Sequence, residues 1–182
     1  MEIEIKARVD DLNEIRKQLK KLKVKKVNFV HQIDEYYSLY KRPLTKVKAG
    51  DILRVRYNHG ERVGRLEYHS IRNQYAAEEY EVSVGDIREL KKILHHMKAR
   101  HEATVNKKRE YYKKGRFIIT LDYVKALGTF VEIELQGDDT KKNRRAIIDM
   151  FHQLGISDKQ FCIDIKYGAE MIRRKGGKYA YF

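Results

Sequence analysis

The chain has 182 residues, and its 40 Lys and Arg against 26 Asp and Glu give a formal net charge of +14 at pH 7. Apolar residues make up 42% of it, which is enough for a packed core and argues against global disorder. It contains no apolar run long enough for a membrane helix, and it opens without a secretory pattern. The single cysteine, Cys162, excludes an internal disulfide and a cysteine-built zinc cluster, so we expect a cytoplasmic protein with no membrane partner.

The first half of the chain predicts one strand, one helix and three more strands. Residues 2–9 alternate charged and apolar side chains with the period of a strand. Asp10 or Asp11 is in place to cap a helix, because apolar residues then recur at helical spacing from Leu12 to Leu22. The three further strands are predicted over 31–40, 51–58 and 63–70.

The same order of elements begins again near residue 77. Residues 78–84 alternate like the first strand, and Asp86 is a second helix cap before an apolar series from Ile87 to Met97. Three strands are predicted over 102–112, 116–123 and 129–136, and a last helix over 138–154. This repeat predicts a single domain over 1–182, with duplicated halves at about 1–75 and 76–155 and a helical C-terminal segment at about 156–182.

Charges of one sign share a face of several predicted strands. Residues i and i+2 of a strand point to the same side, and the predicted strands carry Glu-x-Glu, Arg-x-Arg and Lys-x-Arg pairs. Like charges on one face repel, whereas a solvated sheet more naturally mixes signs. The predicted helices need apolar sheet faces to cover, so we expect the charged faces to turn inward in a curved or closed sheet. For any single strand, a sheet with one solvated face and one core face remains the alternative.

An inward set of charges of both signs points to one kind of ligand. Buried charges are costly unless they are paired or bound to ions. Carboxylate clusters suit a hard divalent cation, and Arg and Lys suit phosphate oxygens. The strand faces therefore predict a site for a metal-bound nucleotide or inorganic polyphosphate.

Six segments, in order along the chain, resemble the motifs of one family. EIEIK at 2–6 resembles the ExExK signature of the CYTH superfamily, the triphosphate tunnel metalloenzymes. The other matches are QIDEYY at 32–37, LRVRY at 53–57, EEYEV at 78–82, VNKKREYY at 105–112 and LDYVKALGTFVEIEL at 121–135. The resemblance implies an α+β fold, an eight-stranded antiparallel closed β-tunnel with flanking helices. It also implies a Mg²⁺- or Mn²⁺-dependent enzyme that acts on a triphosphate-bearing substrate.

The resemblance further implies a role for individual residues. The implied metal ligands are Glu2, Glu4, Glu79, Glu81, Glu132 and Glu134. The implied phosphate contacts are Lys6, Arg54, Arg56, His69, Lys107 and Arg109. The implied catalytic residues are Lys6, Tyr36 and Asp122, with Tyr36 where its hydroxyl can reach the substrate. For Asp122, Glu79 and Glu81, two roles stay open: they are further metal ligands, or they orient the basic residues.

One strand departs from the family pattern. Where the family usually has a phosphate-binding Lys, the segment Leu66–His69 ends in His69. Histidine is mostly neutral at pH 7 unless it is held beside an anion, so His69 either donates to phosphate or faces solvent on an edge strand. The family's C-terminal segment is matched loosely by KYGAEMI at 166–172, which leaves Lys166 as a further phosphate contact.

Two reactions fit a metal–triphosphate site. The overall motif spelling favours a class IV adenylyl cyclase-like enzyme, in which the ribose 3′-hydroxyl of ATP attacks the α-phosphorus and gives cyclic AMP and pyrophosphate. The strand that ends in His69 is nearer the spelling of thiamine triphosphatases, and an inorganic or thiamine triphosphatase, in which water attacks the terminal phosphorus, stays open. The expected substrates are ATP, thiamine triphosphate and tripolyphosphate, and monomer and homodimer both stay open.

Two alternatives belong to other functional classes. One is a basic nucleic-acid-binding protein, and the other is a non-catalytic polyphosphate sensor. Glu-x-Glu strands beside Arg-x-Arg strands argue against a nucleic-acid surface. The basic run at 20–26 is expected to be a solvated helix end, so nucleic acid is not the expected partner.

Overall fold

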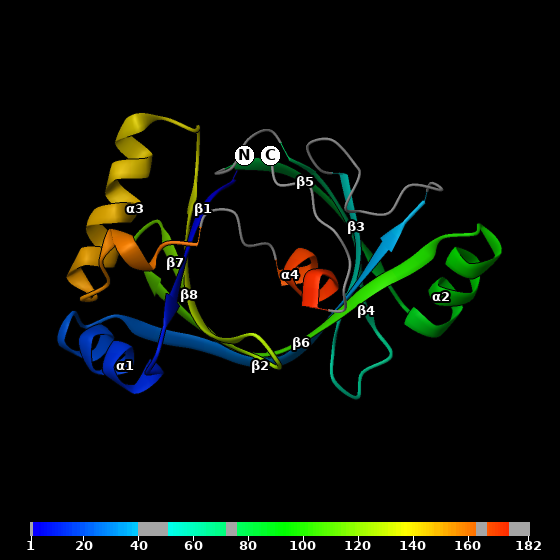
Figure 1. Ribbon diagram of the computed structural model, residues 1–182, viewed down its shortest axis with the longest axis horizontal. Helices are drawn as coiled ribbons and strands as arrows, with labels where there is room; N and C mark the ends of the chain where they lie inside the picture. Colours follow the sequence, from blue (N-terminus) through cyan, green and yellow to red (C-terminus); the bar gives the residue numbers. More distant parts are fainter. Residues whose placement is uncertain (1, 40–50, 72–75, 163–166, 175–182) are drawn as a thin grey trace. The chain divides into compact units, whose positions relative to one another are not determined.

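The computed structural model describes residues 2–39, 51–71, 76–162 and 167–174 (Figure 1). The elements are β1 (Glu2–Val9), α1 (Leu12–Lys21), β2 (Lys25–Ser38), β3 (Asp51–Asn58), β4 (Gly64–Ile71), β5 (Ala76–Val84), α2 (Ile87–His96), β6 (Arg100–Lys114), β7 (Phe117–Val124), β8 (Gly128–Gln136), α3 (Lys141–Gln153), the 3₁₀ helix η2 (Asp158–Gln160) and α4 (Tyr167–Arg174). The strand order is β1-β5-β4-β3-β2-β6-β7-β8, and β8 pairs with β1, so the order returns to its first strand as in a β-tunnel. The predicted α+β fold, with eight antiparallel strands in one sheet, is confirmed.

The chain forms two compact units. The first contains residues 1–30, 74–77 and 107–164, and the second contains residues 31–73, 78–106 and 165–182. The strands β2, β5 and β6 each contribute residues to both units. Each unit has its own apolar core and its own cluster of buried charges, so the two are described separately.

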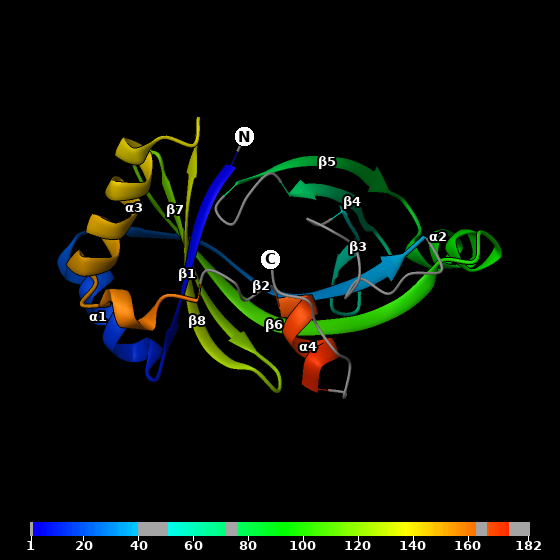
Figure 2. The ribbon, with the colours of Figure 1, turned by 45° about the horizontal axis from the view of Figure 1, so that its top comes forward.

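In the first unit, α1 and α3 cover the apolar face of β1, β7 and β8 (Figure 2). The side chain of Asp11 accepts a hydrogen bond from the backbone N–H of Asn13 and begins α1, as the sequence predicts. The largest fully buried side chains of this core include Phe151 from α3 and Ile133 from β8. Because alternate residues of β1 and β8 fill this core, the residues between them point to the opposite face, where the charges lie.

In the second unit, α2 covers the apolar face of β3 and its neighbours. Asp86 caps α2 through the backbone N–H of Arg88. The core is smaller than that of the first unit and is built around Val55 and Leu53 of β3, with Ile87 and Leu94 of α2. The two caps and the order strand, helix, three strands are the same in both halves of the sequence.

A buried glutamate connects each of the helices α1 and α2 to a strand. Glu110 of β6 accepts hydrogen bonds from Arg16 of α1 and from the hydroxyl of Tyr112. Burial raises the pKa of Glu110, but its contacts with Arg16, Lys26 and Tyr112 outweigh burial and lower it to about 2. Glu35 of β2 has the matching position in the second unit, where Lys91 of α2 and two tyrosine hydroxyls donate to it.

Most predicted bounds lie within one or two residues of the structure, and two predicted elements start at least three residues away from the prediction. β2 starts at Lys25, well before the predicted residue 31, because the basic run leaves the helix at Lys21 and turns at Lys23, which has a φ of 53°. The last long helix starts at Lys141 and not at residue 138, because the side chain of Thr140 caps it. In the predicted C-terminal helical segment, η2 and α4 are helical, while residues 163–166 and 175–182 lie outside the described part of the chain.

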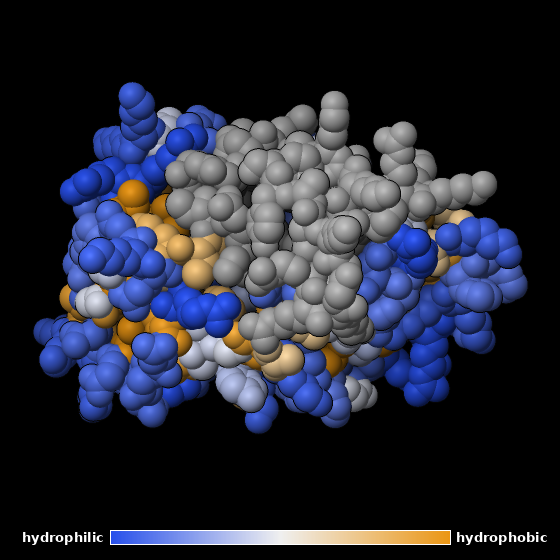
Figure 3. All heavy atoms as spheres, in the orientation of Figure 1, coloured by the Kyte–Doolittle hydropathy of each residue, from blue (hydrophilic) through white to orange (hydrophobic). Residues whose placement is uncertain are grey.

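The surface that Figure 3 draws is mostly hydrophilic where it is described. Figure 3 shows hydrophilic residues over most of the described part of one face, with apolar residues visible where Figure 1 places α1 and α3. Among the described residues, no helix has the length and apolar character needed to span a membrane.

The close approach at Gly64 generates a stability prediction. A Cβ at Gly64 would lie 2.5 Å from the carbonyl oxygen of Arg56 and 2.9 Å from a methyl group of Ile87, whereas a Cβ at Gly85 would meet nothing within 4 Å. We therefore expect Gly64→Ala to lower the free energy of unfolding by about 1–3 kcal/mol through overpacking, as measured by urea denaturation. Gly85→Ala is the matched control, and an equal loss in both variants would contradict this explanation.

Candidate functional site

The first unit contains a group of three carboxylates, Glu4, Glu132 and Glu134, which we call the acidic cluster. Glu4 comes from β1, and the other two come from β8 and lie on one face because they are two residues apart. One oxygen from each lies within 4.8 Å of the others. Glu132 is buried, and Glu4 and Glu134 are half-buried. Three converging carboxylate oxygens are a donor set for a hard divalent cation.

Lys6 lies directly beside the acidic cluster. Its Nζ is 2.9 Å from Oε1 of Glu132 and 3.2 Å from Oε1 of Glu4, and the residue is only 5% exposed. Burial alone would lower the pKa of Lys6, but the negative charges of Glu132 and Glu4 outweigh burial and raise it. Lys6 is therefore charged at neutral pH, and it balances part of the negative charge of the cluster.

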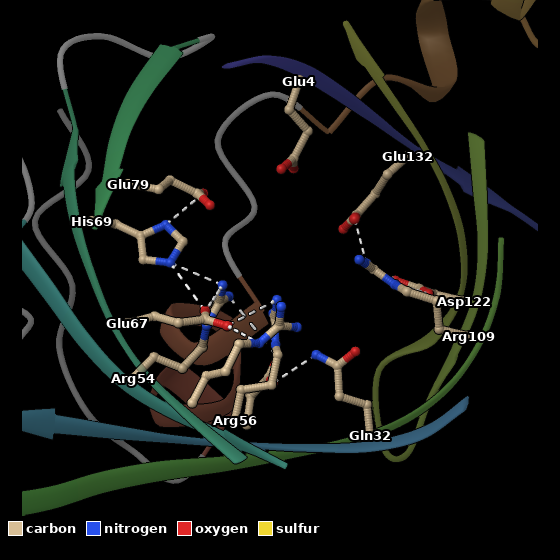
Figure 4. A network of polar contacts seen from close by, with 12 residues as sticks. Glu4, Gln32, Arg54, Arg56, Glu67, His69, Glu79, Arg109, Asp122 and Glu132 are labelled. Atoms are coloured by element: carbon tan, nitrogen blue, oxygen red, sulfur yellow. Dashed lines mark hydrogen bonds and ion pairs between the residues drawn. The ribbon is translucent and has the colours of Figure 1, made fainter. Parts of the chain in front are cut away.

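Arg109 connects the acidic cluster to β7. Nε and Nη2 of Arg109 donate to the two oxygens of Asp122, at 2.7 and 2.5 Å, and Nη2 also donates to Glu132 (Figure 4). Strand register produces this two-pronged contact, because Arg109 of β6 and Asp122 of β7 are directly opposite each other. Burial raises the pKa of Glu132, but the positive charges of Arg109, Lys6 and Lys107 lower it well below its usual range.

A buried hydroxyl lies next to the acidic cluster. Thr120 is directly opposite Glu132 in the pairing of β7 with β8 and is fully buried. Its Oγ1 has no hydrogen-bond partner among the described residues. A buried polar atom without a partner costs free energy, so this hydroxyl indicates a place for a ligand or a ligand-bound water.

The second unit contains a cluster built around two arginines of β3, which we call the arginine cluster: Arg54, Arg56, Asp34, Glu67, His69 and Glu79. Arg56 is opposite Asp34 of β2, and its Nε and Nη2 donate to the two carboxylate oxygens at 2.7 and 3.0 Å. Gln32 donates to the same carboxylate. The Asp34–Arg56 pair thus has the geometry of Arg109–Asp122 with the two residue types exchanged between the strands.

Arg54 is held on the other side of the same cluster. Its Nε donates to Oε2 of Glu67 at 2.6 Å, and its Nη2 is 2.9 Å from Nε2 of His69. Nδ1 of His69 is 2.8 Å from Oε1 of Glu79, so the ring lies between Arg54 and Glu79 (Figure 4). Burial raises the pKa of Glu67, but its partners, among them the positive charges of Arg54 and Arg56, lower it to about 2.

Tyr36 packs against the C-terminal helix. A Cβ added at Gly168 of α4 would lie 2.9 Å from the ring of Tyr36. The ring therefore packs directly against the backbone of α4 at this glycine. The ring centroid of Tyr36 is 6.0 Å from the guanidinium carbon of Arg54. Burial raises the pKa of the Tyr36 hydroxyl, so at neutral pH this hydroxyl is protonated.

The structure divides the predicted site residues between the two units. Lys6, Lys107, Arg109, Asp122, Glu4, Glu132 and Glu134 lie in the first unit, and Arg54, Arg56, His69, Tyr36, Glu79 and Glu81 lie in the second. Glu81 is exposed, and its Oε2 lies 3.4 Å from Nη1 of Arg65. Of Glu2, only the backbone in β1 is described, and Lys166 lies outside the described residues.

Sequence reasoning missed four polar residues of these clusters, namely Gln32, Asp34, Glu67 and Thr120. Asp34 lies inside the QIDEYY match, and its signal is its register opposite Arg56. Glu67 shares a face with His69 at i, i+2, but its own pattern gives no hint that it binds both arginines. Thr120 could not be found from the sequence, because a threonine within a strand is common and no sequence pattern marks it as part of a site.

Comparison with known proteins gives a family and a fold. The family described as "CYTH domain" matches residues 1–162. A protein of Methanocaldococcus jannaschii named "Putative adenylate cyclase MJ0240" is 28% identical over 155 residues, which cover 85% of this chain and 87% of that protein.

Two solved structures extend the comparison. The PH1012 protein of Pyrococcus horikoshii has a TM-score of 0.82 at 23% identity, over 94% of this chain and 99% of that one, which shows the same fold. A protein of Hippeastrum has a TM-score of 0.69 at 15% identity, over 96% of both chains, and its title reads "Putative adenylyl cyclase HpAC1 from Hippeastrum reveals a dominant triphophatase activity".

The lowered pKa of Glu67 generates a prediction on acid stability. A carboxylate whose pKa is lower in the folded than in the unfolded state contributes stability above its unfolded pKa and loses it as the pH falls towards its folded pKa. With a change from 4.5 to about 2, the contribution of Glu67 is about 3 kcal/mol near neutral pH. Glu67→Gln should therefore be destabilised at pH 7, and its difference from the parent protein should shrink between about pH 4.5 and pH 2.

Urea denaturation at several pH values measures this difference. Glu61→Gln, at an exposed position, is the control and should change the free energy of unfolding by less than about 0.5 kcal/mol. A difference between parent and Glu67→Gln that does not depend on pH in this range would refute the prediction.

Proposed function

The chain belongs to the CYTH domain family, and from this membership and its two charge clusters we propose that it is a metal-dependent enzyme acting on a triphosphate-bearing substrate. The observation that carries the proposal is the acidic cluster of Glu4, Glu132 and Glu134 with Lys6 and Arg109 in contact with it. A metal–polyphosphate ligand requires both carboxylates and fixed cations, and a site with one sign alone would not hold it.

The residues present fit a divalent cation such as Mg²⁺ or Mn²⁺. The three carboxylates of the acidic cluster offer oxygen donors only, which these ions prefer. The hydroxyl of Thr120, buried and without a partner among the described residues, lies beside Glu132 and suits a water of the hydrated ion. When bound, the metal would neutralise phosphate charge and help position the attacking group.

The buried cations of the first unit, Lys6 and Arg109, supply phosphate contacts in this proposal. Lys6 and Arg109 are almost fully buried and, like the cations of the arginine cluster, are already positioned by carboxylates. Positioned cations stabilise the negative charge that develops in phosphoryl and nucleotidyl transfer without having to reorganise first. Asp122 and Asp34 act by orienting Arg109 and Arg56, which is the second of the two roles that the sequence leaves open for Asp122.

Two reactions share this site, and each has one supporting observation. The relative from Methanocaldococcus jannaschii carries an adenylate cyclase name, which supports formation of cyclic AMP and pyrophosphate from ATP. The Hippeastrum protein is described as having dominant triphosphatase activity, which supports hydrolysis of the terminal phosphate. We favour the cyclase reaction because the relative of that name is the more similar in sequence, and we keep the triphosphatase as the second candidate.

Product analysis separates the two reactions. The full chain is incubated with ATP, thiamine triphosphate or tripolyphosphate, each with Mg²⁺ or Mn²⁺, and the products are resolved by ion-exchange chromatography. Cyclic AMP with pyrophosphate supports the cyclase, and orthophosphate with a diphosphate product supports the triphosphatase. Absence of turnover with all three substrates and both metals would count against any enzymatic function of this kind.

Substitution in the acidic cluster tests the metal directly. We expect Glu134→Gln to reduce turnover at least about 100-fold, since a catalytic metal supplies several kcal/mol of transition-state stabilisation. Binding of Mn²⁺, followed by electron paramagnetic resonance without substrate, should weaken in the same variant. The control is Glu14→Gln on the exposed face of α1, which should leave both measurements unchanged. Full activity after removal of divalent metal by a chelator would contradict the proposal.

A further inference from the structure

His69 has contacts on both ring nitrogens, and they differ in chemistry. Nδ1 is 2.8 Å from a carboxylate oxygen of Glu79, and Nε2 is 2.9 Å from Nη2 of Arg54. Nε2 is also 3.3 Å from Oε2 of Glu67. The side chain of His69 is 10% exposed, so water has little access to either nitrogen.

The contact with Arg54 decides which nitrogen carries the hydrogen. A guanidinium has donors and no acceptor, so at 2.9 Å the Nε2 atom of His69 must accept. A carboxylate has only acceptors, so Nδ1 must donate to Glu79. In the opposite tautomer, two N–H groups would face each other at Arg54, and Nδ1 would face Glu79 with a lone pair.

We propose that His69 is a positioning residue, which is held by Glu79 as the neutral Nδ1–H tautomer and fixes the Arg54 guanidinium for contact with phosphate. Arg54 is then held along one edge by two acceptors, because its Nε and Nη2 reach Oε2 of Glu67 and its Nη2 also reaches Nε2 of His69. The distance of 3.3 Å between Nε2 and Glu67 follows from this arrangement, since both atoms accept from the same donor group.

This role explains the departure of His69 from the usual family residue. A Lys at this position would place a second positive charge beside Arg54, and it could not accept a hydrogen bond from the guanidinium. The neutral imidazole accepts from a cation on one side and donates to a carboxylate on the other, which few side chains can do. His69 therefore does not contact phosphate itself in this proposal, and it supports Arg54, which does.

The internal repeat provides a comparison within the chain. Glu67 and His69 of β4 correspond to Glu132 and Glu134 of β8, because each pair ends the strand–helix–three-strand unit at i, i+2. In the first unit, the second position is a carboxylate and belongs to the acidic cluster. In the second unit, the corresponding residue is His69, which accepts a hydrogen bond from Arg54 in this proposal. The same position of the repeat therefore supports an arginine side chain in the second unit.

Nitrogen NMR tests the arrangement without any assumption on function. In the full chain labelled with ¹⁵N-histidine, the resonances of His69 are assigned by comparison with His69→Gln, and the tautomer is determined from the two ring ¹⁵N shifts at neutral pH. We expect Nδ1 to carry the hydrogen and Nε2 to be bare. A ring with the hydrogen on Nε2, or on both nitrogens, would overturn the inference.

Two substitutions separate positioning from a merely structural role. The side-chain oxygen of Gln can take the place of Nε2 and accept from Arg54, whereas Asn can only replace Nδ1 and cannot reach Arg54. In isothermal titration calorimetry with tripolyphosphate, we expect His69→Gln to bind within about threefold of the parent protein and His69→Asn to bind about tenfold more weakly. His95→Gln, on the exposed surface of α2, is the control.

The outcomes distinguish this inference from the proposed function on which its ligand depends. Equal weakening in His69→Gln and His69→Asn, together with unchanged urea stability, would overturn positioning and indicate that the ring itself contacts phosphate. Failure of the parent protein to bind tripolyphosphate would contradict the phosphate part of both proposals, and the NMR tautomer would still decide whether His69 holds Arg54.

Discussion

The buried arginine–aspartate pair across two neighbouring strands is the interaction on which both clusters depend. A guanidinium buried from water requires a partner of opposite charge with matching geometry, and a directly opposed carboxylate can accept both hydrogen bonds of its fork. Arg109–Asp122 and Asp34–Arg56 satisfy this requirement at the same register of β6–β7 and β2–β3. The residue types are exchanged between the two pairs, and the shared arrangement agrees with the duplicated halves that the sequence predicts.

The residue that follows each of these charges anchors the opposite face of the strand. Glu35 follows Asp34 and Glu110 follows Arg109, and strand alternation turns both glutamates towards the helices. There Glu35 binds Lys91 of α2 and Glu110 binds Arg16 of α1. One short segment of each long strand therefore fixes both the charged face and the covering helix, which explains why these strands tolerate so many buried ionisable groups.

The helices, the strands and most charged residues of the two clusters could be predicted from the sequence. The hydrogen-bond partners of these charged residues could not. Alternation placed Arg54 and Arg56 on one face, and the helix caps Asp11 and Asp86 were apparent from their positions before apolar series. The roles of Glu67 and His69 depend on which side chains of β3 and β5 reach them, and these contacts depend on register and side-chain length. The start of β2 at Lys25 was missed because a run of lysines satisfies helix and strand equally well on an exposed surface.

The pKa directions of the first unit indicate what a ligand must displace. The charges around Lys6 raise its pKa and those around Glu132 lower its pKa, so both groups are ionised over the whole neutral range. A metal bound at the acidic cluster, as proposed above, would therefore need no release of a proton from Glu132, and it would compete with Lys6 for Glu132 and Glu4. A phosphate that arrives with the metal gives Lys6 a new anionic partner at the same time. Because each ion compensates for the contact that the other disrupts, the two should bind together more tightly than the sum of their separate affinities.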